Sequence, residues 1–170
     1  LRTAAFVRAE LGKMGVEIQP LDTEVGVLGI IRGAKAGPGK VVALRADMDA
    51  LPIQESADLP DKSEVAGVMH ACGHDAHTAM LLGAAKLLTD MRSRFSGVVK
   101  LIFQPAEETL GGSELMIRLG CLENPHVDIM LGQHGIGEFI TGDIAFREGP
   151  SMASSDTFSV TVKGAGGHGA

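Results

Sequence analysis

Apolar and polar residues along the chain follow two periods, one typical of helices and the other of strands. Apolar residues at helical spacing predict helices over residues 3–14 and from Asp75 to about residue 91. Glycines before and after residues 114–119 indicate a further short helix there. The Asp75 side chain is the expected N-cap of the second helix. Short β-branched and apolar runs predict strands at 25–31, 41–46, 98–103, 127–131, 142–146 and 157–163. Strands that alternate with helices indicate an α/β fold with an open sheet and flanking helices.

Side chains that can bind metal or transfer protons follow three of these predicted strands. In chain order they are Asp47, Asp49, Glu107, Glu108 and His134. In open α/β sheets, ligands bind beyond the carboxyl ends of the strands. We therefore expect these side chains to meet at one edge of the sheet.

The segment 69–77 is the densest group of such residues. Within eight positions it holds four potential metal ligands, His70, Cys72, His74 and His77. A regular helix would point Cys72 and His74 in different directions, whereas a loop with a glycine between them lets both reach one metal pair. His77 lies one helical turn further on and is a candidate to orient a ligand. The alternative is a helix N-terminus with solvated histidines, but the number of ligands favours a metal site.

The two other motifs are weaker on their own. Glu107 and Glu108 could form a solvated corner, and His134 could be an ordinary loop histidine. Beside a metal, however, one carboxylate can bind the ion while its neighbour takes a proton from activated water. Sulfur, nitrogen and oxygen ligands together favour a catalytic zinc site over a structural one, which would be richer in cysteine.

Composition narrows the class of protein further. The 170 residues carry a net charge of −6, which argues against nucleic acid and anionic membranes as partners. No apolar run approaches the length of a membrane span, and the first residues do not resemble a signal peptide, so we expect a cytoplasmic protein. The two cysteines, Cys72 and Cys121, do not form a disulfide framework. Both ends of the sequence resemble cuts, so we expect a fragment.

These motifs resemble those of the M20 metallopeptidase superfamily, most closely its amidohydrolase branch of hippurate hydrolases, N-acyl amino acid deacylases and auxin-conjugate hydrolases. The matching blocks follow the family order along essentially the whole chain and lie at residues 44–52, 69–77, 103–108, 132–134 and 149–154. The resemblance implies a zinc-peptidase-like catalytic domain over residues 1–155. It also implies that 156–170 begin an inserted α+β lid or dimerisation domain with its first strand.

The resemblance assigns roles residue by residue. It implies that Cys72, His74, Glu108 and His134 bind two divalent metal ions, which zinc, manganese or cobalt would all suit. Glu107 matches the general base, and His168 matches a lid histidine that steadies the tetrahedral oxyanion. A further family ligand, a histidine near the C-terminus, is absent from this chain.

The sequence departs from the superfamily pattern at two positions. Wider members carry a metal-binding histidine where Asp47 stands, so Asp47 is left out of the ligand set, and Asp49 is expected to orient ligands. After His134 the family often has a bulkier residue than Gly135.

The expected function is hydrolysis of the amide bond of a small N-acyl amino acid or similar conjugate. The resemblance also suggests a homodimer formed through the lid domain. The alternative is a catalytically incomplete fragment or remnant that acts, if at all, through association.

Overall fold

The computed structural model describes residues 1–154 and 156–169, and its contacts divide the chain into two units, Leu1–Ile136 and Gly137–Ala170. The predicted domain boundary at residue 155 and the last residue, 170, lie outside the described residues. The division predicted from the sequence, 1–155 and 156–170, stays a prediction.

The first unit is built around a five-stranded mixed sheet with the strand order β1-β2-β4-β3-β5. The strands are β1 (Glu17–Gln19), β2 (Val27–Arg32), β3 (Val41–Asp47), β4 (Val98–Gln104) and β5 (Ile129–Gly132). β3 runs parallel to both β4 and β5, while β2 is antiparallel to β1 and β4. The expected open α/β sheet is confirmed.

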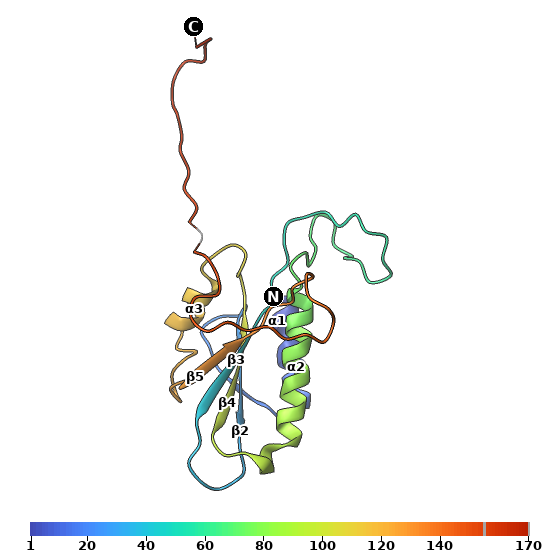
Figure 1. Cartoon of the computed structure of the whole chain (residues 1–170), viewed down its shortest axis with the longest axis vertical. Helices are drawn as coiled ribbons and strands as arrows, with labels where there is room; N and C mark the ends of the chain where they lie inside the picture. The colour runs from blue at the N-terminus through green and yellow to red at the C-terminus, as the bar shows by residue number, and fades with distance from the viewer. Residues whose placement is uncertain (155, 170) are drawn as a thin grey trace. The chain divides into compact units, whose positions relative to one another are not determined.

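Helices cover both faces of this sheet (Figure 1). They are α1 (Arg2–Lys13), α2 (His74–Asp90), the short 3-10 helix η1 (Arg92–Arg94) and α3 (Gly112–Arg118). α1 and α2 pack on one face and α3 on the other. Neighbouring residues of a strand point to opposite faces, so Val27 joins the α1–α2 core while Leu28 joins the α3 core. Burial on both sides explains why the central strands are nearly continuous apolar runs.

The sequence located the main elements of this unit within a few residues but missed β1 and η1. These two elements are only three residues each, which is too short to show a period. The expected cap of the second helix was wrong. The N-cap of α2 is Gly73, and no side chain caps the helix there.

Residues 137–154 and 156–169 form no helix or strand. The strands predicted at 142–146 and 157–163, the second of which was to open the lid domain, were therefore wrong. Their large apolar side chains are exposed, from 77% for Val160 to 96% for Phe146. Alternating apolar residues show that a segment can join a sheet, but a strand forms only when another strand pairs with its backbone. None of the helices in the described part of the chain has both the length and the apolarity needed to cross a membrane.

Candidate metal centre

Three parallel strands end at the same edge of the sheet and bring distant parts of the sequence together. The last residues of β3 and β4, Asp47 and Gln104, are direct register partners. Gly132, at the end of β5, pairs with Arg45 of β3. The loops after these strands therefore begin side by side, as the sequence predicted.

The N-terminus of α2 delivers Cys72 and His74 to this edge. Gly73 adopts a left-handed conformation with φ of 77°, which glycine tolerates better than other residues. This turn lets the two side chains approach the same space, although they lie only two residues apart. His74 is the first residue of the helix, and its side chain is 1% exposed.

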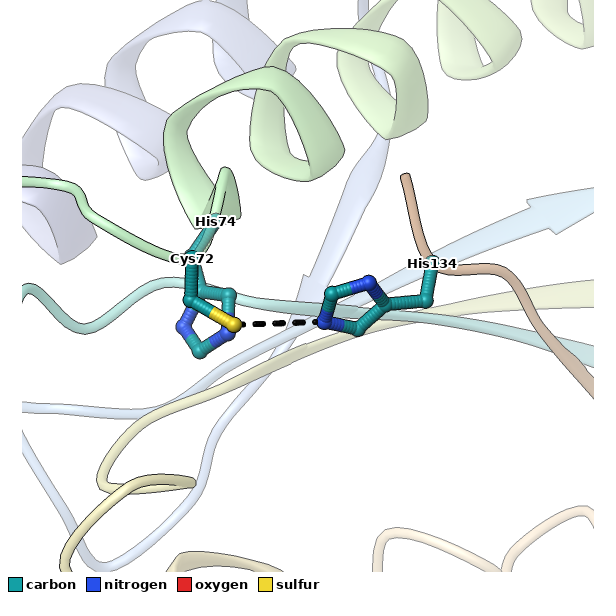
Figure 2. A group of neighbouring side chains, drawn as sticks. All are labelled: Cys72, His74 and His134. Atoms are coloured by element: carbon teal, nitrogen blue, oxygen red, sulfur yellow. Dashed lines mark hydrogen bonds between the residues drawn. The ribbon is translucent and has the colours of Figure 1, made fainter. Parts of the chain in front are cut away.

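His134, in the loop after β5, lies beside Cys72. Its Nε2 lies 3.4 Å from the Cys72 Sγ, across 62 residues of sequence. Figure 2 shows the side chains of Cys72, His74 and His134 gathered at the start of α2. One atom of each, a sulfur or a ring nitrogen, lies within 4.8 Å of the others. Three such ligands can hold one ion.

The two glutamates after β4 also lie close to His74. Glu108 Oε1 and Glu107 Oε2 lie 3.8 and 4.0 Å from His74 Nε2. These distances are too long for hydrogen bonds, and both ring nitrogens of His74 are buried without a hydrogen-bond partner. Buried polar atoms are almost always paired. An unpaired imidazole among carboxylates and a thiol suits a divalent metal, so these residues fit a metal pair.

The surrounding charges support the same interpretation. Burial, together with the hydrogen bond and the negative charge of Glu108, raises the pKa of the Cys72 thiol to about 11. Glu107 and Asp47 add to this effect. Without a cation, the surrounding negative charge keeps the Cys72 thiol protonated. A bound cation would instead favour the Cys72 thiolate.

The Asp49 carboxylate lies next to two of these residues, His74 and Glu108. Its Oδ2 accepts a hydrogen bond of 3.0 Å from the backbone N–H of Glu108, and its Oδ1 lies 3.3 Å from His74 Nδ1. This position is the one expected of a residue that orients ligands.

The turn that carries the glutamates depends on a glycine at the start of α3. A Cβ on Gly112 would lie 1.7 Å from the backbone oxygen of Pro105. Gly112 donates its N–H to the backbone oxygen of Ala106, which itself has a positive φ of 49°. Because residue 112 has no side chain, its backbone can pack closely against Pro105 and Ala106, in the turn that carries Glu107 and Glu108.

Asp47 and His77 form a second polar pair beside the centre. His77 Nδ1 lies 2.7 Å from Asp47 Oδ1, and His77 Nε2 accepts a hydrogen bond of 2.9 Å from the Gly135 N–H. Asp47, His74 and His77 also lie close enough to hold an ion. Both His77 nitrogens already have partners, however, so neither has a lone pair for a metal. No pattern in the sequence indicates that Asp47 and Gly135 contact His77.

The charge on Asp47 is stabilised locally. Burial opposes its ionisation, but the hydrogen bond from His77 and the positive charge of Arg45 together hold its pKa below the ordinary value of 3.8. Arg45 Nη1 lies 2.7 Å from Asp47 Oδ2.

The structure thus brings together five of the six site residues predicted from the sequence. The five are Cys72, His74, Glu107, Glu108 and His134. The sixth, His168, belongs to the unit Gly137–Ala170, and its role at an oxyanion stays a prediction.

Comparisons with known proteins identify the family. The model of peptidase family M20/M25/M40 matches residues 43–165. Thermostable carboxypeptidase 1 of Saccharolobus solfataricus is 51% identical over 98% of this chain and 42% of its own length. IAA-amino acid hydrolase ILR1-like 4 of Arabidopsis thaliana is 47% identical over all of this chain and 38% of its own length.

A solved structure shares the fold. The Bacillus subtilis YXEP protein, described as a dinuclear metal-binding peptidase of the M20 family, has a TM-score of 0.75 and 42% sequence identity. The match covers 79% of this chain and 37% of that protein. The chain thus spans about two fifths of the length of these relatives. On the matched family model and these identities, the chain belongs to peptidase family M20/M25/M40.

Proposed function

We propose that this chain forms the metal-binding part of an amidohydrolase that cleaves the amide bond of N-acyl amino acids or similar small conjugates. The observation that carries the proposal is the buried His74 imidazole. Neither of its ring nitrogens has a hydrogen-bond partner, although Cys72, Glu107, Glu108 and His134 lie close to it. The relatives support the reaction class, because their names describe a carboxypeptidase and an amino acid conjugate hydrolase.

Cys72, His74, Glu108 and His134 are the proposed ligands of two divalent metal ions. Zinc, manganese and cobalt all accept this mixture of thiolate, imidazole and carboxylate. When bound, such a pair polarises the scissile carbonyl and makes water a better nucleophile at neutral pH.

Glu107 is the proposed general base. Its side chain is 40% exposed, more than the 23% of Glu108, so it can reach a water molecule and a substrate. Its carboxylate takes a proton from the attacking water, and the resulting carboxylic acid gives that proton to the leaving amine nitrogen as the C–N bond breaks. His168 is proposed to donate a hydrogen bond to the oxyanion, and the lid is proposed to mediate a homodimer.

The test compares Glu107→Gln with the wild type in the complete product of the gene that encodes this chain. Hydrolysis of a panel of N-acyl amino acids is followed, together with bound metal measured by mass spectrometry. We expect turnover to fall about 100- to 10,000-fold with the metal content unchanged. Normal turnover in the variant would exclude Glu107 as the base, and an inactive wild type would exclude the substrate class.

A further inference from the structure

Gly135 is held from two directions, and these contacts link the buried pair Asp47–His77 to the candidate ligand His134. The Gly135 N–H donates to His77 Nε2 at 2.9 Å. The Gly135 backbone oxygen lies 2.7 Å from His134 Nδ1. The loop that carries His134 is thus fixed to α2 through one imidazole.

The donors and acceptors in this chain of contacts fix the tautomers of both histidines. A backbone N–H can only donate, so His77 Nε2 must carry a lone pair and the hydrogen lies on Nδ1. His77 Nδ1–H then donates to Asp47 Oδ1. By the same argument, a backbone oxygen can only accept, so His134 carries its hydrogen on Nδ1. Its Nε2 faces the Cys72 sulfur.

The Asp47–His77 end of this chain of contacts is buried, which restricts its movement. Asp47 and His77 have side chains 1% and 2% exposed. The backbone oxygen of Asp47 accepts a further hydrogen bond of 3.0 Å from the Thr78 hydroxyl. The rings of His77 and His134 also pack edge to face with centroids 4.6 Å apart. His134 itself is exposed, so these contacts determine its orientation more than core packing does.

We propose that Asp47 and His77 are positioning residues that set the tautomer and direction of His134 for metal binding, an inference that rests on the proposed metal centre. We call this chain of hydrogen bonds, Asp47–His77–Gly135–His134, the His77 clamp. Asp47 fixes the His77 tautomer, His77 fixes the Gly135 peptide, and Gly135 orients His134. Neither Asp47 nor His77 needs to touch the metal.

The main test titrates the complete product of the gene that encodes this chain with cobalt(II). His77→Phe keeps a ring of similar size but removes both nitrogens, and we expect cobalt affinity to fall about 10- to 100-fold. The cobalt absorption bands should also shift, because a misdirected His134 changes the ligand field. His77→Gln, whose side-chain oxygen can still accept from Gly135, should recover part of the affinity. The matched control is His126→Phe, since His126 is an exposed histidine that contacts Glu123, and it should bind like the wild type.

A second measurement works without metal. Nitrogen chemical shifts of the imidazole rings in the metal-free chain report which nitrogen carries the hydrogen. We expect Nδ1–H for both His77 and His134 in the wild type, and tautomer exchange at His134 in His77→Phe. An Nε2–H tautomer at His77, or unchanged cobalt affinity and spectrum in His77→Phe, would overturn the clamp. A wild type that binds no cobalt would instead contradict the metal centre, and the nitrogen shifts would still decide whether the clamp exists.

Discussion

The carboxylate of Asp49 accepts a hydrogen bond from the backbone N–H of Glu108, a residue 59 positions further along the chain. The same carboxylate faces His74 Nδ1 at 3.3 Å. One partly buried side chain after β3 thus lies against both the start of α2 and the turn after β4. The arrangement of the two proposed ligands therefore depends on a residue outside the proposed ligand set.

Replacing Asp49 with Ala should weaken metal binding about 10- to 100-fold, because it releases both proposed ligands at once. Asp49→Asn should have a smaller effect, since one amide oxygen can still accept from the Glu108 N–H. Competition with a chelator measures the affinities. Asp58→Ala is the control, because Asp58 is fully exposed and pairs only with Lys62 among the contacts described. Equal affinities for Asp49→Ala and the wild type would contradict this role.

The two cysteines offer an internal comparison. Cys72 lies beside His134, whereas Cys121 is buried in the α3 core on the other face of the sheet. We expect Cys72→Ala to lower the metal content of the chain and Cys121→Ala to leave it unchanged. Metal analysis of the two purified variants checks this. A similar loss in both would mean that the fall reflects folding rather than a missing ligand.

A single methyl group at residue 112 should disturb the carboxylate turn. In Gly112→Ala the new Cβ would overlap the Pro105 oxygen, so the backbone must move, at a cost of about 1–3 kcal/mol in the free energy of unfolding. Metal affinity should fall as well, because Glu107 and Glu108 lie on that turn. Urea denaturation and metal titration measure the two effects.

Gly83→Ala provides the matched control for this substitution. A Cβ at Gly83, in the middle of α2, meets nothing within 4 Å. Alanine there should raise the free energy of unfolding by about 0.5–1 kcal/mol, because it favours the helix. Destabilisation in both variants would show that the Pro105 contact is not the cause.

The low pKa of Asp47 predicts how stability depends on pH. Burial raises the pKa of Asp47, but the hydrogen bond from His77 and the charge of Arg45 lower it more. The folded carboxyl therefore has a pKa below its ordinary value of 3.8. The unfolded state therefore binds a proton first as the pH falls. The stabilisation is complete above 3.8 and disappears as the pH falls through the lower folded pKa.

Asp47→Asn lacks this titration. The difference in free energy of unfolding between the wild type and Asp47→Asn should therefore shrink on acidification below 3.8. Urea denaturation across the acidic range measures it. A difference that stays constant over that range would contradict the ionised state of Asp47.

The sheet and the ligand cluster could be predicted because each leaves a local signal. The apolar runs that become β3 and β4 are buried on both faces, and burial on both faces is what a continuous apolar run indicates. Cys72 and His74 are recognisable by their chemistry and spacing. The glutamates were located correctly because they follow a strand.

The remaining features depend on contacts that no local pattern records. The start of α2 was misplaced because Gly73 begins the helix through its backbone conformation, without a capping side chain. The partners of His77 lie 30 and 58 residues away. The strands expected in the second unit failed for the same reason, since alternation in a sequence does not supply a pairing partner.

The Cys72–His134 contact, which spans 62 residues, also bears on the order of folding. A nascent chain can form α2, and so present Cys72 and His74, well before β5 has been synthesised. His134 can join them only after β5 has docked beside β3, which requires a long loop to close. Tight metal uptake therefore reports completed long-range strand pairing rather than local helix formation. A cobalt signal developing during refolding would time that docking step directly.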